Sequence, residues 1–87
     1  NLPEPRIRLL PGKRGNFVID ATYKYFPPLK ESLQEILSSF SGKKVWISSK
    51  RDWKEAEFGP QDVVVIYGPK PMMLPILEEV RLNPLET

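Results

Sequence analysis

Residues 63–73 read VVVIYGPKPMM, and this stretch decides how the chain can fold. The first five residues, 63–67, are apolar and have no polar face. They therefore predict a strand at the centre of a sheet, covered at least in part on both sides. Gly68 and the prolines after it make a stiff exit from this strand. The following stretch, 72–82, predicts a helix, with Pro75 in the first turn, where proline is tolerated.

Three more strands are expected upstream of residue 63. RIRLL at 6–10 alternates between polar and apolar residues, and FVIDATY at 17–23 is rich in β-branched and aromatic residues. PGKRGN at 11–16 carries two glycines that accept positive φ, so these strands form a hairpin. KKVWIS at 43–48 alternates again and predicts the third strand in chain order.

The clearest helical signal lies between the hairpin and the third strand, in residues 28–42. Pro28 suits the first turn of a helix, and Gly42 suits the left-handed residue that follows its end. The apolar residues of this segment share one helical face: Leu29, Leu33, Ile36, Leu37 and Phe40. We expect this stripe to be buried against the apolar side of the strands: Ile19, Val45, Ile47, Val63 and Val65.

The element order β-β-α-β-β-α predicts an α+β fold. We expect a two-layer sandwich in which two helices pack on one face of a mixed four-stranded sheet, with a right-handed strand-helix-strand crossover. The polar stretch 50–61 is expected to be a long connection. Its aromatic residues, Trp53 and Phe58, either plug the edge of the core or form an exposed contact for a partner.

Length and composition predict one small domain that spans residues 1–87. The chain begins with Asn, and prolines lie in the linker-like ends 1–5 and 83–87, so we expect a domain excised from a longer protein. No apolar run approaches the roughly 20 residues that span a bilayer, no signal peptide is visible and cysteine is absent. These features favour an intracellular protein without a membrane partner.

The sequence offers little for catalysis. It has no histidine and no cysteine, which excludes disulfides, thiolate zinc sites and Ser-His or Cys-His nucleophiles. Asp20 is the one carboxylate that the pattern places on a strand, where it ligates magnesium, faces solvent or pairs with a lysine across the strands. We therefore expect no enzymatic activity, no cofactor and no metal.

The stretch IYGPKPMM at 66–73 resembles the last strand and turn of ferredoxin-reductase-like nicotinamide domains, which often carry a Y-x-C-G-P-x-x-M pattern. The match covers fewer than ten residues, and the cysteine of the pattern is missing. The resemblance implies a fragment of a nucleotide- or nicotinamide-binding enzyme domain. The residues themselves favour a rigid exit from a core strand, because Pro69 and Pro71 lack the N–H donors that a phosphate cradle needs.

Strand parity predicts a basic open face on the sheet. Side chains two residues apart share a face, so the residues opposite the expected core positions point outward together. With Lys50, which follows the third strand, they form the expected binding surface: Arg6, Arg8, Lys24, Lys44, Trp46 and Lys50. Lys13 and Arg14 in the hairpin loop extend it.

This surface suggests a binding module rather than an enzyme. Our first interpretation is a contact with another protein, or with a neighbouring domain of the same parent chain. The alternative is a domain for single-stranded RNA or DNA, in which the cations contact phosphates and Trp46 stacks on a base. The third interpretation is the nicotinamide-domain fragment.

Overall fold

The computed structural model describes residues 7–12 and 15–82, the last two of these by their backbone alone. The elements are β1 (Arg8–Pro11), β2 (Phe17–Tyr23), α1 (Lys30–Leu37), β3 (Lys44–Ile47), α2 (Lys50–Glu55), β4 (Val63–Pro69) and α3 (Lys70–Leu82). The linker-like ends expected at 1–5 and 83–87 lie outside the described residues.

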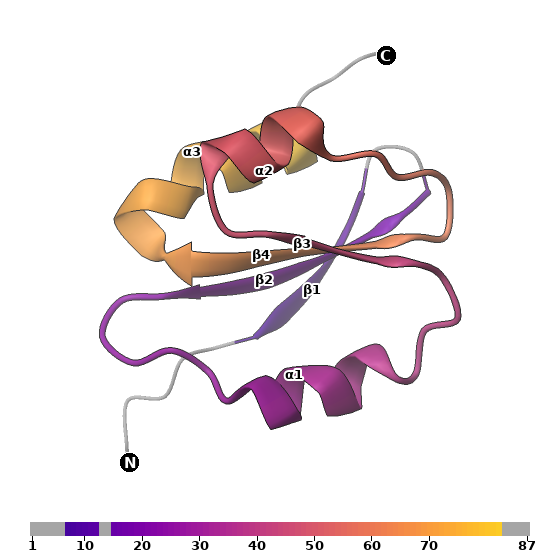
Figure 1. The fold of residues 1–87 in the computed structure, drawn as a ribbon, viewed down its shortest axis with the longest axis horizontal. Coiled ribbons are helices and arrows are strands. Elements are labelled where there is room, and N and C mark those ends of the chain that lie inside the picture. The colour runs from indigo at the N-terminus through magenta and orange to yellow at the C-terminus, as the bar shows by residue number, and fades with distance from the viewer. Residues whose placement is uncertain (1–6, 13–14, 83–87) are drawn as a thin grey trace.

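The four strands form one mixed sheet in the order β1-β2-β4-β3 (Figure 1). β1 and β2 pair antiparallel, as the hairpin requires, whereas β4 runs parallel to both of its neighbours, β2 and β3. The α+β class and the mixed four-stranded sheet are thus confirmed, and so is the central position of residues 63–67.

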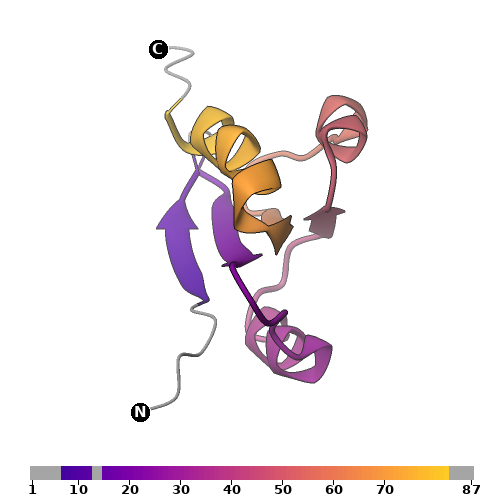
Figure 2. The same cartoon turned by 90° about the vertical axis from the view of Figure 1, so that its left-hand side faces the viewer.

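The helices cover both faces of the sheet, whereas the sequence led us to expect both on one face. α1 lies on one side of the sheet, and α2 and α3 lie on the other (Figures 1 and 2). The physical reason is the apolar run in β4. Val64 and Ile66 face α3, Val63 and Val65 face α1, and each pair needs its own cover.

The core on the α3 side is the larger one. It consists of Val18, Ile47, Val64, Ile66, Met73, Ile76, Leu77 and Val80. α3 contributes four of these side chains, at the spacing of one helical face. Gly68 allows the close approach of α3, because a Cβ atom at this position would lie 2.8 Å from Cγ of Met73.

The core on the α1 side consists of Ile19, Ala21, Leu33, Leu37, Val63 and Val65. The predicted burial of Leu33 and Leu37 is confirmed, but Leu29 is 69% exposed and Ile36 is 36% exposed. Leu29 precedes the first helical residue and has extended backbone, so it is not on the helical face that the periodicity assigned to it. The predicted partners Val45 and Ile47 lie on the α3 side of the sheet.

The polar stretch 50–61, expected to be a connection, contains the short helix α2. The hydroxyl of Ser49 accepts a hydrogen bond from the amide of Asp52 at 3.1 Å, which caps the helix start. Trp53 and Phe58 stack with ring centroids 6.1 Å apart and pack against the α3-side core. The indole N–H of Trp53 also donates to a Glu79 carboxylate oxygen at 2.8 Å, which ties α2 to α3.

α3 begins at Lys70, earlier than the sequence pattern suggested. Pro75 therefore lies in the second turn of the helix rather than in the first. In the second turn, its missing N–H removes one hydrogen bond of the helix. Its exposed position, away from the core face, accommodates the ring. No helix among residues 7–12 and 15–82 has the length and apolar character needed to cross a membrane.

We predict that Leu33→Ala lowers the free energy of unfolding by about 2–5 kcal/mol, because the side chain is fully buried between α1 and the sheet. Ile36→Ala on the same helix is the matched control, with an expected loss of at most about 1 kcal/mol. Urea unfolding followed by circular dichroism measures both. Equal losses at the two positions would contradict the orientation of α1.

The turn before β4 gives a second prediction. Gln61 has a φ of 71° in a turn where the Asp62 amide donates to the Gly59 carbonyl at 3.2 Å. An L-residue in this region costs roughly 1–2 kcal/mol, partly offset in Gln61→Gly by the entropy of glycine. The free energy of unfolding should therefore rise by about 0.5–1 kcal/mol in the same urea assay. The reciprocal change, Gly15→Ala at a φ of 81°, should lower it, and a gain there would refute the argument.

Candidate functional site

Among the described residues, those expected from strand parity on one basic open face do not share a face. Arg8 lies on the α3 side of the sheet, beside the side chain of Asp20, and Trp46 packs on the α1 side. Strand parity places alternate residues on opposite faces of the sheet, but it does not determine which face each helix covers. The apolar residues of β2 lie on both faces. Three other members of the expected surface, Arg6, Lys13 and Arg14, lie outside the described residues.

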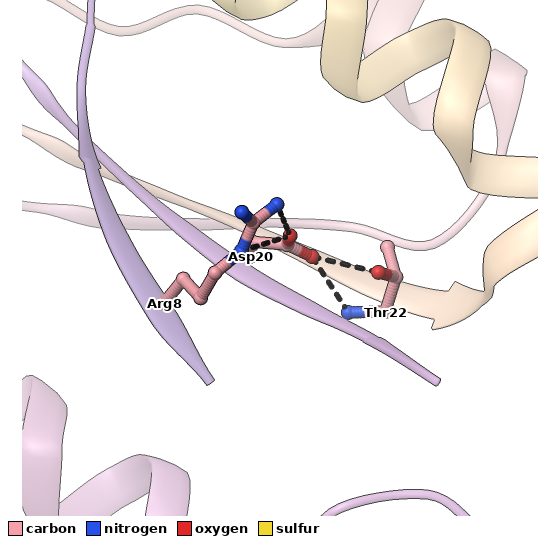
Figure 3. A network of polar contacts seen from close by, with 3 residues as sticks. All are labelled: Arg8, Asp20 and Thr22. Atoms are coloured by element: carbon pink, nitrogen blue, oxygen red, sulfur yellow. Dashed lines mark hydrogen bonds and ion pairs between the residues drawn. The ribbon is translucent and has the colours of Figure 1, made fainter. Parts of the chain in front are cut away.

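Arg8 is committed to an internal ion pair (Figure 3). Its Nε and Nη2 atoms donate to Oδ2 of Asp20 at 3.1 and 2.7 Å. The other oxygen, Oδ1, accepts the amide and the hydroxyl of Thr22 at 3.1 and 2.7 Å. Asp20 is buried, and this network satisfies both of its carboxylate oxygens. Of the roles considered for Asp20, the structure shows pairing with a cation across the strands, but the cation is Arg8 rather than a lysine.

Two opposing effects act on the pKa of Asp20. Burial raises it, but the hydrogen bonds from Thr22 and Arg8 and the positive charge of Arg8 outweigh burial and hold the pKa below its ordinary value. The pKa of Asp62 is also lowered, chiefly because its carboxylate accepts the amide of Gly59 at 2.9 Å. Both carboxylates therefore stabilise the fold in their ionised form.

Trp46 and Lys44 are engaged on the α1 side. The Trp46 ring meets the ring of Tyr67 edge-on, with centroids 6.0 Å apart, and Tyr67 meets Tyr23 at 5.8 Å. Trp46 is half-buried in this aromatic row, and the Lys44 ammonium donates to the carbonyl of Phe40. These contacts occupy the ring that the nucleic-acid interpretation assigned to base stacking and the ammonium group that it assigned to a phosphate.

The parallel strands create a different candidate site. β2, β4 and β3 all end at one edge of the sheet, which we call the carboxyl edge (Figure 1). Tyr23 and Pro69, the last residues of β2 and β4, are paired neighbours. From there the chain turns to α1 on one face and to α3 on the other (Figure 2). Such a reversal at the carboxyl ends of parallel strands is where open α/β sheets bind their ligands.

Large apolar side chains are exposed in the two segments that leave this edge, residues 24–30 and 68–72. They are Tyr25, Phe26, Leu29 and Met72, which are 53–71% exposed. Four prolines stiffen the same segments: Pro27, Pro28, Pro69 and Pro71. We call these two segments, together with residues 48–50 after β3, the carboxyl-edge surface.

The carboxyl-edge surface is also basic. Its lysines are Lys24, Lys30, Lys50 and Lys70, and all four are exposed. Two of them lie over aromatic rings: Nζ of Lys24 is 5.6 Å from the ring centroid of Tyr25, and Nζ of Lys30 is 5.8 Å from that of Tyr67. Of the basic residues expected on the open face, Lys24 and Lys50 are therefore on the candidate site.

Sequence reasoning missed four members of this surface. Lys30 and Lys70 were not considered, and Leu29 was assigned to the core. Met72 was correctly assigned to a helix but not to a binding surface. The signal was nevertheless present, because KYFPPLK and GPKPM each follow a buried strand, and parallel strands end at a common edge. Within the described ranges, no group of three or more acidic, histidine or cysteine residues is placed to hold a metal ion.

We predict that Asp20→Asn lowers the free energy of unfolding at pH 7 by about 1–3 kcal/mol, because the buried network loses its charge. The folded pKa of Asp20 lies below its unfolded value of 3.8, so its contribution is complete at neutral pH and disappears as the pH falls through the folded pKa. Acid unfolding between pH 5 and 2 should therefore be less steep in Asp20→Asn.

Glu55→Gln is the control for this prediction, since Glu55 forms an exposed ion pair with Arg51 at 3.5 Å. Its free energy of unfolding should change by less than about 0.5 kcal/mol, and its acid unfolding between pH 5 and 2 should be as steep as that of the parent protein. If acid unfolding is equally steep in Asp20→Asn and in the parent protein, Asp20 does not carry the pH dependence of stability.

Comparison of the chain with protein-family models, with curated proteins and with solved structures found no match.

Proposed function

We propose that this chain is a non-catalytic module that binds another protein, or a neighbouring domain of its parent chain, through the carboxyl-edge surface. The observation that carries the proposal is the group of large apolar side chains exposed in two segments that leave paired strands. Apolar side chains gathered at one place on a surface, with polar groups around them, are typical of sites where proteins associate.

The rigidity of the segments supports the same proposal. Proline fixes φ, so the chain directly after Phe26 and directly before Met72 has few conformations to lose when a partner binds. The aromatic ring of Phe26 is of the type that anchors protein interfaces, and lysines around it form a polar rim. A fixed apolar centre with a charged rim is suited to binding a protein rather than to catalysis.

The nicotinamide-domain interpretation gains less support from this edge. A phosphate cradle depends on consecutive backbone N–H groups at a helix start. α3 begins at Lys70, and the prolines on both sides of that residue donate no N–H. The remaining groups at this edge are apolar side chains and lysines, which suit the surface of a protein.

A second candidate, single-stranded nucleic acid, is favoured by one observation. Lys24, Tyr25 and Phe26 place a cation beside two exposed rings, which is the combination that holds a phosphate and stacks on bases. Leu29 and Met72 count against it, because aliphatic side chains add little to base stacking and much to contacts with protein side chains.

The proposal can be tested without a known partner. The domain is immobilised and used to select ligands from a phage-displayed library of random twelve-residue peptides, and each selected peptide is mapped by NMR. We expect shifts at residues 24–30 and 68–72. Phe26→Ala should weaken binding by about tenfold or more, as expected for an aromatic anchor, and leave the thermal midpoint unchanged because the ring is exposed.

A matched pair of leucines provides the control. Leu29→Ala on the carboxyl-edge surface should weaken peptide binding, whereas Leu9→Ala on β1, where the side chain is 55% exposed, should not. Shifts centred on β1, or equal losses at both leucines, would refute the proposed surface. A mixed-sequence single-stranded DNA that binds this edge more tightly than any selected peptide would favour the second candidate instead.

A further inference from the structure

We infer that the segment bound at the carboxyl-edge surface is acidic, with Asp or Glu residues on either side of an apolar anchor. This inference rests on the proposed function and specifies the chemistry of the partner. Its basis is the distribution and the environment of the lysines around the exposed apolar side chains.

The charge of the chain is unevenly distributed. The three segments that leave the carboxyl edge, residues 24–30, 48–50 and 68–72, contain four lysines and no acidic residue. The remainder of the chain contains nine basic and eleven acidic residues, so the net charge of +2 originates at this edge. A surface whose charges are all positive, beside exposed apolar side chains, favours partners that carry negative charge.

The protein does not neutralise these lysines itself. Within residues 7–12 and 15–82 the ion pairs join Arg8 to Asp20 and Arg51 to Glu55, so none of the four lysines has a carboxylate partner there. The nearest acidic side chain after β3, Asp52, already accepts the amide of Ser48 at 3.0 Å. An incoming carboxylate therefore meets ammonium groups that are free to pair.

Three of these lysines occupy helix positions where lysine is disfavoured. Lys30, Lys50 and Lys70 are the first residues of α1, α2 and α3. The start of a helix carries partial positive charge, which favours acidic residues and disfavours lysine. A residue that opposes local stability in three successive helices, at the same edge, indicates a role in binding.

A protein carboxylate fits this surface better than a nucleic-acid phosphate does. The lysines lie in the same segments as exposed aliphatic and aromatic side chains, Leu29 and Met72 among them, so a ligand of this surface must supply apolar side chains together with its negative charge. An acidic peptide with a leucine or phenylalanine does this in one segment. A nucleic acid supplies the charge and flat rings, but no aliphatic group of that kind.

The selection experiment gives the test. Peptides selected by the parent domain are sequenced and compared with the unselected library, and we expect Asp and Glu to be enriched several-fold beside a Phe, Leu or Trp. The tightest peptide is then resynthesised with Asn and Gln in place of Asp and Glu. Its dissociation constant, measured by isothermal titration calorimetry, should rise about tenfold, and raising the salt concentration should weaken the acidic peptide more than its amide counterpart.

Charge reversal separates a binding role from a structural one. In Lys30→Glu and Lys70→Glu, the acidic residue suits the helix start, and this gain offsets the loss of the contact between Lys30 and the Tyr67 ring, so the thermal midpoint should rise or stay constant. Binding of the acidic peptide should nevertheless fall at least tenfold in the double variant. Lys54→Glu, an exposed lysine in the last turn of α2 that is absent from the carboxyl-edge surface, should leave binding unchanged.

The outcomes distinguish failure of the acidic-partner inference from failure of the proposed function. Peptides that map to the carboxyl edge without acidic enrichment, or an amide peptide that binds as tightly as the acidic one, would overturn the inference and leave the proposed function standing. Failure to select any peptide for this edge, or tighter binding of a single-stranded DNA there, would overturn both. A loss of binding in Lys54→Glu equal to that in the double variant would show that only the overall charge matters.

Discussion

Burial of β4 on both sides is the constraint on which the rest of the structure depends. Its apolar residues alternate between the two faces, and each face must be removed from water by a separate helix. This requirement places α1 and α3 on opposite sides of the sheet. It also sends the chain in opposite directions from the paired ends of β2 and β4, and the surface at the carboxyl edge is a consequence of that divergence.

The two faces are covered unequally. α3 buries four side chains against the sheet and is joined to α2 by the hydrogen bond between Trp53 and Glu79, whereas α1 buries two. On the α1 side, Trp46, Tyr67 and Phe40 fill the remaining space as half-buried rings. Of the residues that sequence reasoning assigned to an exposed binding face, Trp46 therefore helps to complete the α1-side core, and Arg8 pairs with Asp20 on the other side.

The sequence predicted those parts of the fold that depend on short-range patterns. The hairpin, the buried strand at 63–67 and the burial of Leu33 and Leu37 followed from alternation and helical periodicity. The side on which each helix packs did not follow, because parity relates residues within a strand but not between strands. α2 was missed because a six-residue helix has too few turns to show a stripe, although the cap formed by Ser49 and Asp52 was readable.

The candidate site was harder to predict than the fold. Its residues come from segments far apart in the sequence, and they meet only because three strands run parallel. Lys24 and Lys50 were included in the predicted surface through strand parity, although their actual position follows from the strand ends. Leu29 shows the limit of periodicity most clearly. It continues the apolar stripe in the sequence, but the helix begins at the next residue, and the backbone of Leu29 is extended.

The central strand β4 follows both of its partner strands, β2 and β3, in the sequence, and this order affects how the sheet forms during synthesis. β3 pairs with β4 alone, and β2 has no parallel neighbour except β4. A growing chain that ends before residue 63 can form the β1–β2 hairpin, but it leaves β3 and the inner edge of β2 without hydrogen-bond partners. These hydrogen bonds can form only once residues 63–69 have been synthesised, and until then the edges of β2 and β3 that face β4 depend on other means to avoid aggregation.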